Sequence, residues 1–337
     1  MSAEQTLKVK NFVLSSGVIL PDAEFEYRTW GDLGSPVVLV FHPLTGNSNA
    51  AEWWDGIIGE GKLLDPKNYF IICSNFLGSC SGSSGPESIN SQTGLAYRAA
   101  FPTITTGDIA LQNLAILHSL GITEVSLGIG GSMGGMVLLE LAAYMPDLFQ
   151  RIIAISISDS HSAWRLAFSS VIRKTIEAFG KADAEKGLES GLQLARQIAM
   201  TSYRCSAEFD GRFGRDKNNN RFEIENYLEH HGEKIIKRFS PFSYITLTKA
   251  MEEYDIRKVI GDIRAKVLFI GTNSDILYSE KEIRGLASRL KNAEYQTLDA
   301  PFGHDSFLVA QDKLAKLIKA FLLSKQQKNQ SLLLETY

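Results

Sequence analysis

Short runs of consecutive apolar residues recur along the chain, at residues 37–41, 69–73, 125–129, 152–157 and 267–270. Uninterrupted runs of this kind are typical of parallel strands that are buried on both faces. Residues 109–120 and 136–144, between such runs, show helical spacing instead. The first 30 residues alternate, with Phe25, Tyr27 and Thr29 on one side, which predicts a half-buried antiparallel strand. The alternation of strands and helices predicts an α/β fold, with a mostly parallel central sheet and helices on both faces.

The pattern changes between residues 162 and 254, where apolar positions recur at helical spacing, charges are dense and no continuous apolar run appears. This segment predicts a helical insertion between two strands of the sheet. Helices are expected again at residues 280–290 and 306–323. We therefore expect four parts along the chain. They are a first core part at 1–160, a helical lid at 161–258, a second core part at 259–323 and a loose C-terminal tail at 324–337.

The composition is that of an ordinary globular protein, because 44% of the residues are apolar and 22% are charged. The net charge of −3 gives no indication of nucleic-acid binding, and we expect the most basic stretch, 212–221, to be a solvated loop. The odd number of three cysteines argues against a disulfide framework or a zinc site. The sequence shows neither a secretory signal nor an apolar run long enough to span a bilayer. These features predict a soluble, cytoplasmic protein that binds neither nucleic acid nor membrane.

A glycine-rich turn at residues 130–135, Gly-Gly-Ser-Met-Gly-Gly, contains the pattern G-x-S-x-G around Ser132. It follows the apolar run 125–129 and precedes the helix expected at 136–144, which is the strand–turn–helix context of a nucleophile elbow. Side chains at the flanking positions would collide with the neighbouring strand and helix, and glycine avoids this. A serine that only caps a helix would not need four glycines around it. We therefore interpret Ser132 as a covalent nucleophile.

A serine hydroxyl needs a base to remove its proton, and the chain has six histidines. His304 is the candidate base, because it follows the strand-like stretch 294–298 and precedes the final helix, in a loop that could meet the elbow. His118, His230 and His231 are expected in solvated or packing roles. Neither H-x-x-x-H nor H-E-x-x-H spacing occurs, so no metal site is expected.

The acid that orients the base should lie between the serine and the histidine in the sequence. Asp275, which follows the run 267–270, is favoured. Asp159, just beyond the run 152–157, is the alternative, but a cap or surface role beside the insertion explains it more easily. This order of nucleophile, acid and base predicts an enzyme of the α/β-hydrolase fold.

Two backbone N–H groups should bind the oxyanion that forms during acyl transfer. Met133, directly after the nucleophile, supplies the first. The early loop at residues 41–46 supplies the second, and Leu44 is the expected donor because Pro43 has no N–H.

Five segments resemble the homoserine O-acetyltransferases of methionine biosynthesis. They are His42-Pro43-Leu44-Thr45-Gly46, Trp53-Trp54-Asp55-Gly56, the segment from Cys73 to Asn90, the segment from Gly130 to Met136, and Gly303-His304-Asp305. The resemblance runs from about residue 8 to residue 322 in one order and without large gaps, so it is more specific than any single motif.

The resemblance implies a hydrolase-like core with a helical lid, and a homodimer joined through the lid helices. It also implies a ping-pong reaction, in which an acetyl group passes from acetyl-CoA to the serine and then to the side-chain hydroxyl of L-homoserine. Acetyl-CoA is a co-substrate, and no other cofactor is expected. Arg196 and Asp305 match the family's substrate-binding residues, and a guanidinium and a carboxylate suit the two charged groups of an α-amino acid. Arg173 and Tyr203 also match family-like positions, but the resemblance implies a substrate-binding role for them less strongly.

Three positions depart from the family pattern: Pro43 replaces a usual alanine, Ser169 a frequent asparagine and Ala199 a common glycine. They leave open a relative that uses succinyl-CoA or serine. Two other classes also remain as alternatives. One is a serine esterase or thioesterase with water as acceptor, and the other is a non-catalytic binding protein of the same fold.

Overall fold

The computed structural model describes residues 2–182 and 186–324, and the predicted tail beyond residue 324 lies outside them. Its main feature is an eight-stranded sheet in the order β1-β2-β4-β3-β5-β6-β9-β10. β1 and β2 form an antiparallel pair, β2 pairs antiparallel with β4, and all remaining pairs are parallel. The prediction of a mostly parallel sheet is confirmed. The strands are β1 (Ser2–Val13), β2 (Ile19–Trp30), β3 (Val37–Phe41), β4 (Phe70–Ser74), β5 (Leu127–Gly131), β6 (Arg151–Ile155), β9 (Lys266–Thr272) and β10 (Ala293–Leu298).

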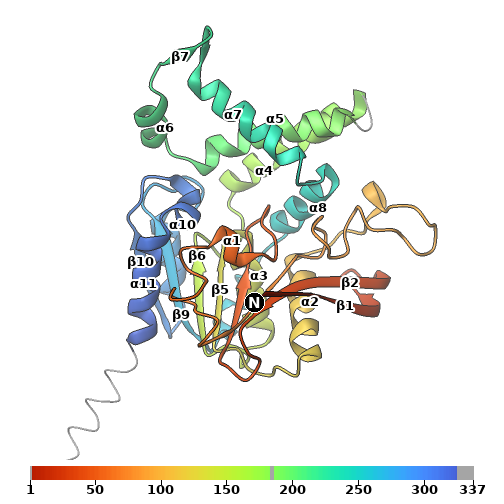
Figure 1. The fold of residues 1–337 in the computed structure, drawn as a ribbon, viewed down its shortest axis with the longest axis vertical. Helices are drawn as coiled ribbons and strands as arrows, with labels where there is room; N and C mark the ends of the chain where they lie inside the picture. Colours follow the sequence, from red (N-terminus) through yellow and green to blue (C-terminus); the bar gives the residue numbers. More distant parts are fainter. Residues whose placement is uncertain (1, 183–185, 325–337) are drawn as a thin grey trace, which may run out of the picture.

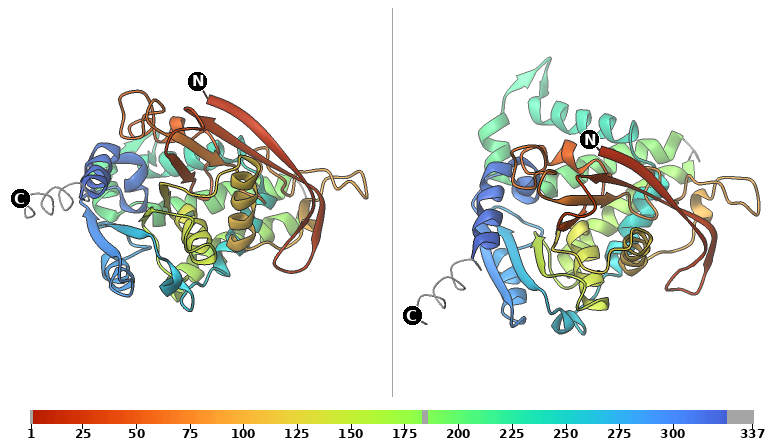
Figure 2. Two further views of the ribbon diagram at one scale, coloured as in Figure 1. Left: turned by 90° about the horizontal axis from the view of Figure 1, so that it is seen from below. Right: turned by 60° about the horizontal axis from the view of Figure 1, so that its bottom comes forward.

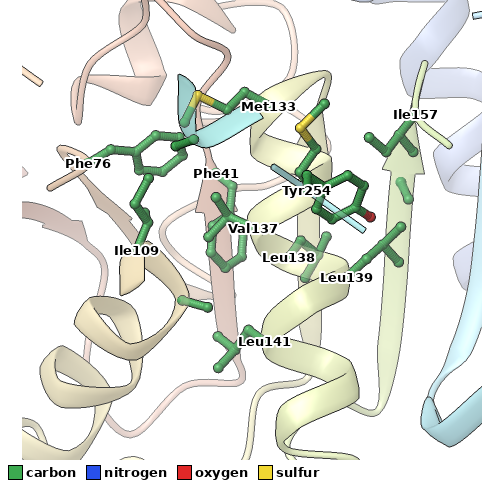
Figure 3. Packing of buried hydrophobic residues seen from close by; sticks show 14 of the residues in the cluster. Phe41, Phe76, Ile109, Met133, Val137, Leu138, Leu139, Leu141, Ile157 and Tyr254 are labelled. Atoms are coloured by element: carbon green, nitrogen blue, oxygen red, sulfur yellow. The ribbon is translucent and has the colours of Figure 1, made fainter. Parts of the chain in front are cut away.

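Two hydrophobic cores lie on the two faces of this sheet. Along β3, Leu39 and Phe41 belong to one core, whereas Val38 and Val40 belong to the other, as alternation in a strand requires. The first core packs against α2 (Thr106–Ser119), α3 (Met133–Tyr144) and α9 (Glu280–Ala287). The second packs against α1 (Ala50–Trp53) and α11 (Gln311–Leu323). Figure 3 shows the side chains of α3 in the first core.

The segment between β6 and β9 is largely helical and lies above the sheet in Figure 1, on the side where the parallel strands end. It leaves and re-enters the core at one place, because Ser160 pairs with Asp255 in an isolated bridge. Its helices are α4 (Ala163–Ala182), α5 (Lys186–Tyr203), α6 (Ser206–Phe213), α7 (Glu223–Ile236) and α8 (Pro241–Glu252). We call this segment the lid. Figure 2 gives two further views of how it covers the core.

Several boundaries differ from the predictions. The helix expected from residue 136 begins at Met133, because the elbow places the helix directly after Ser132. The last helix is interrupted: η3 (Gly303–Asp305) and α10 (Ser306–Val309) precede α11, and Ala310 between them has non-helical angles. The lid also contains a small hairpin, β7 (Lys217–Asn218) and β8 (Arg221–Phe222), within the stretch expected to be a loop. Two further short helices are η1 (Arg98–Ala100) and η2 (Ile260–Asp262).

The hairpin is explained by its turn residues. Asn219 and Asn220 have φ angles of 49° and 65°, a conformation that asparagine tolerates better than most residues.

None of the helices in the described part of the chain is both long and apolar enough to cross a membrane.

Candidate active site

The nucleophile elbow is the turn that joins β5 to α3, and the backbone around Ser132 is closely packed. Ser132 has a φ of 54° and a ψ of −128°, a strained conformation for a residue with a side chain. A Cβ atom on Gly134 would lie 2.3 Å from the carbonyl oxygen of Phe41, and one on Gly130 would lie 2.7 Å from the backbone of Gly134. The collisions expected from the sequence therefore involve the neighbouring strand β3 and the helix itself. These close backbone contacts keep Ser132 in its strained conformation at the turn, at the carboxyl end of β5.

His304 and Asp275 form a buried pair beside the elbow. His304 Nδ1 lies 2.8 Å from Asp275 Oδ2, and both residues are at least nine-tenths buried. The other carboxylate oxygen of Asp275 accepts hydrogen bonds from the N–H groups of Leu277 and Tyr278, at 2.8 and 3.1 Å. Burial lowers the pKa of His304, but the charge and hydrogen bond of Asp275 outweigh it, so the pKa lies above its ordinary value. Asp275 thus fixes both the orientation and the basicity of the imidazole.

The alternative acid, Asp159, has another partner. Its carboxylate forms an ion pair with Arg289, and its backbone carbonyl accepts a hydrogen bond from Ile256 where the lid returns to the core. It therefore connects structural elements, and the structure places Asp275 at the imidazole instead.

Ser132 and His304 line the same two cavities, so the three residues lie together at the carboxyl ends of β5, β9 and β10. Among the described residues, the Ser132 hydroxyl makes no hydrogen bond, to His304 or to any other group. Hydrogen bonds of this kind often tighten only when substrate is bound. The arrangement is suited to nucleophilic attack by Ser132 with His304 as base.

The two N–H groups expected to bind an oxyanion are both available. Neither Leu44 nor Met133 donates its backbone N–H to an acceptor in the described part of the chain. Leu44 lines both cavities together with Ser132, and Met133 is the first residue of α3, where helical N–H groups lack intrahelical acceptors. The two donors could therefore serve one developing negative charge.

His42 holds the loop that carries Leu44, a role that sequence reasoning missed. The residue is fully buried, its Nε2 accepts a hydrogen bond from the N–H of Phe76 at 3.2 Å, and its Nδ1 lies 2.8 Å from the carbonyl oxygen of Pro43. Since Phe76 donates to Nε2, the proton must be on Nδ1, which donates to Pro43. Burial lowers the pKa of His42 to about 4 and keeps the ring neutral.

The carbonyl of Pro43 and the N–H of Leu44 belong to one planar trans peptide and point in opposite directions. The Pro43 carbonyl also accepts a hydrogen bond from the N–H of Gly46, at 2.8 Å. Because His42 and Gly46 fix the carbonyl, they also fix the direction of the Leu44 N–H. The only sequence signal was the position of His42 directly after β3.

Arg196 and Asp305, the predicted substrate-binding pair, both line a cavity of about 430 Å³ whose wall includes Ser132 and His304. We call it the outer cavity. The Arg196 guanidinium lies over the ring of Tyr203, 5.4 Å from its centroid, and no carboxylate of the described residues is within ion-pair distance of it. Asp305 is held by Arg204, whose Nε lies 3.2 Å from Oδ2, a contact that the sequence did not reveal. The outer cavity therefore presents a cation and an anion in the same wall as Ser132.

Tyr203 and Arg173, whose roles the resemblance implied less strongly, lie in different parts of the structure. Tyr203 lines the outer cavity and a second, smaller cavity, and burial raises its pKa. Arg173 lines neither cavity and pairs with Glu252 at 3.1 Å and with Glu177 at 3.5 Å. Arg173 thus ties α4 to α8 within the lid.

The start of α4 is anchored to the loop that carries Asp275. Arg165 donates to the carbonyl of Leu277 at 2.9 Å and forms a two-point pair with Glu282, at 2.6 and 2.8 Å. Its guanidinium lies 4.3 Å from the ring centroid of Tyr278, and that ring stacks on His304. No sequence pattern indicated this contact, because the partners are more than 100 residues apart.

No group of three or more His, Cys, Asp or Glu residues in the described ranges could hold a metal ion.

These features define a class of protein. The α/β-hydrolase fold family matches residues 36–311. The solved structure of esterase E22 covers 96% of this chain and all of its own, with a TM-score of 0.87 and 23% identity. The homoserine O-acetyltransferase of Bacillus anthracis has the same TM-score and identity, with 96% of this chain and 98% of its own covered. At this identity the two structures show the fold alone.

The particular family follows from a closer relative. The homoserine O-acetyltransferase of Trichormus variabilis is 41% identical over 342 aligned positions, which cover 97% of this chain and 93% of the relative. The chain therefore belongs to the homoserine O-acetyltransferase family, and the resemblance found in the sequence is confirmed.

Proposed function

We propose that this protein transfers an acetyl group from acetyl-CoA to the side-chain hydroxyl of L-homoserine, through an acyl-Ser132 intermediate. The observation that carries the proposal is the pair of opposite charges, Arg196 and Asp305, on the wall of the cavity that holds Ser132. A guanidinium binds a carboxylate and a carboxylate binds an ammonium, so the pair suits an α-amino acid. A simple esterase would have no need for both.

In the first half-reaction, His304 takes the proton of Ser132, and Ser132 Oγ attacks the thioester carbonyl. The N–H groups of Leu44 and Met133 bind the oxyanion. The C–S bond then breaks, and the thiolate of coenzyme A takes the proton from His304. Lys234 and Arg238 on the wall of the outer cavity, together with Arg196, give this region positive charge suited to the phosphates of coenzyme A. Burial, and then the nearby charge of Arg196, lowers the pKa of Arg238.

In the second half-reaction, His304 removes the proton of the homoserine hydroxyl, which attacks the carbonyl carbon of the acyl-serine. The bond from that carbon to Ser132 Oγ then breaks, and His304 returns the proton to Ser132. Water at about 55 M competes with this acceptor, so transfer depends on positioning, for which effective molarities reach ~10⁵ M and above. Arg196 and Asp305 provide that positioning, and the lid limits the entry of water. A ping-pong order follows if coenzyme A must leave the outer cavity before the amino acid occupies it.

The decisive experiment combines intact-protein mass spectrometry with an acceptor panel. Brief mixing with acetyl-CoA should add one acetyl group at Ser132, and homoserine should discharge it faster than serine or water does. A succinyl adduct, or discharge by serine, would indicate the corresponding relative. Release of coenzyme A at the same rate with and without homoserine would favour the esterase or thioesterase alternative.

Replacing Arg196 with methionine should raise the KM for homoserine by about 10- to 100-fold, the cost of a lost charge-assisted hydrogen-bonding partner. Steady-state kinetics at saturating acetyl-CoA measures it. The matched control is Arg173→Met, which removes an arginine paired with Glu252 outside the cavity and should leave this KM within about twofold. Equal effects of the two substitutions would contradict the role of Arg196.

Replacing His42 with phenylalanine should lower kcat by about 10²–10³-fold with little change in KM, because the Leu44 N–H loses its fixed direction. His42→Asn should retain more activity, since its amide can still donate to the Pro43 carbonyl. Steady-state kinetics and a thermal melting curve are measured for each variant. The comparison distinguishes a loss of kcat caused by the direction of the Leu44 N–H from a loss of folded protein. If His42→Phe lowers only the melting temperature and the folded enzyme keeps its kcat, His42 has no positioning role.

We further propose a homodimer joined through the lid, in the cytoplasm and in methionine biosynthesis. The dimer is supported by apolar side chains that the lid exposes, Trp164, Val171 and Phe179 on α4, with exposed fractions of 54%, 53% and 42%. Exposed apolar groups of this size favour association. Sedimentation of the wild type and of Val171→Asp would test the interface, since a buried charge there should release monomers.

A further inference from the structure

Ser132 lies where two cavities meet. The outer cavity holds the charged groups described above, and a second cavity of about 60 Å³ also has Ser132 in its wall. We call this second one the inner cavity. Ser132, His304, Leu44 and Tyr203 line both, whereas Arg196 and Asp305 line only the outer one. An acyl group on Ser132 thus has two directions in which to extend, and the two differ in size and charge.

The inner cavity is small and its wall is mainly apolar. Phe168 and Ile172 of α4, Met251 of α8 and Leu277 contribute apolar side chains, and the lid supplies most of them. A water-sized group needs at least about 15 Å³ of such volume, so the cavity has room for roughly four of them. Coenzyme A and its pantetheine arm cannot enter a space of this size.

The inner cavity also lacks a free positive charge in the described part of the chain. Arg165 is 3% exposed, and its charge is matched by the two-point pair with Glu282. Burial, and then the charge of Arg165, lowers the pKa of His161 to about 4, so this ring is neutral near pH 7. A carboxylate placed here would be desolvated without a cation to compensate it, which is costly.

We propose that the inner cavity receives the alkyl part of the acyl group and restricts the donor to short, uncharged acyl chains. The inference rests on the proposed function and adds the place and the size limit of the acyl group. In the first half-reaction the bond from Ser132 Oγ to the acyl carbon forms and the C–S bond breaks, while the alkyl part lies in the inner cavity. It stays there when the acceptor hydroxyl attacks, so the outer cavity is free for coenzyme A first and for the amino acid afterwards.

The experiment measures labelling of the full-length protein, without acceptor, by acyl-CoA esters of increasing length. Wild type should be labelled at Ser132 by acetyl-, propionyl- and butyryl-CoA. Hexanoyl-CoA should react at least about tenfold more slowly than butyryl-CoA, because an overfilled pocket discriminates by roughly 10- to 200-fold. Ile172→Ala and Met251→Ala enlarge the inner cavity at different positions and should each restore labelling by hexanoyl-CoA. Leu308→Ala, which enlarges only the outer cavity, is the matched control and should leave the length limit unchanged.

The effects of acyl-group charge and acyl-group size on labelling are distinguished by two acyl-CoA esters of the same shape. The 4-methylpentanoyl group has the branched outline of the succinyl group but carries no charge. In Ile172→Ala the 4-methylpentanoyl ester should label Ser132, whereas succinyl-CoA should not. Equal labelling by both would overturn the requirement for an uncharged chain.

Two failures remain distinguishable. A normal acetyl adduct with a length limit that moves in Leu308→Ala but not in the inner-cavity variants would overturn this inference alone. Absence of any adduct at Ser132 from every ester would overturn the proposed function and this inference with it.

Discussion

Replacing Ser132 with alanine is expected to abolish acyl transfer, with a loss of about 10⁴–10⁶-fold, because the covalent intermediate is proposed to form on this hydroxyl. The acyl adduct seen by mass spectrometry should disappear as well. Binding of coenzyme A should persist, since the substitution removes one hydroxyl oxygen from a turn that the glycines hold in place.

Ser126→Ala is the matched control for this variant. Ser126 precedes the same strand, β5, at its opposite end, away from both cavities. The activity of the Ser126→Ala variant should stay within about twofold of wild type. An acyl adduct that survives in Ser132→Ala would show that another residue is the nucleophile, and the proposed mechanism would be wrong.

Replacing Asp275 with asparagine is expected to lower kcat by about 10³–10⁴-fold while the fold is retained. The asparagine oxygen can still accept the N–H groups of Leu277 and Tyr278, so its amide nitrogen faces His304 Nδ1. An N–H group there favours the imidazole tautomer with the proton on Nε2. That tautomer cannot accept the proton of Ser132.

The pH profile gives a second measurement on the same variant. The neutral imidazole is the base, so activity falls as the pH drops through the pKa of His304. Asp275 raises that pKa, so its loss should move the acid limb of the profile to lower pH. The matched control is Asp159→Asn, which breaks the pair with Arg289 and should leave the acid limb where it is. A shift in Asp159→Asn but not in Asp275→Asn would contradict the assignment.

The sequence predicted the fold because its signals are local. Strand runs without polar residues, glycines around Ser132 and the order of serine, acid and histidine can each be read from neighbouring positions. It also led to the confirmed family. It did not determine where helices break, since at the interruption near Ala310 the Phe307 carbonyl accepts a hydrogen bond from Trp54 and the Gln311 side chain accepts one from Gly56, both more than 250 residues away.

The choice between Asp275 and Asp159 shows why a site needs tertiary structure. Both follow apolar strands that lie side by side in the sheet, so position along the chain could only favour one. The structure separates them because one carboxylate faces His304 and the other faces Arg289. The contacts of His42, of Arg204 with Asp305 and of Arg165 with Glu282 were likewise invisible in the sequence.

By itself, then, the sequence determined the class of fold, the nucleophile elbow and the family, because each depends on residue types at short spacing. Only the tertiary structure decided which charges are paired and which face the cavities, since burial and partners are set by segments far apart in the chain. Arg196 and Arg173 are both lid arginines in the sequence, yet one faces the cavity with no carboxylate partner among the described residues and the other is paired with Glu252. The free energy of a buried charge depends on that difference, and so does its role.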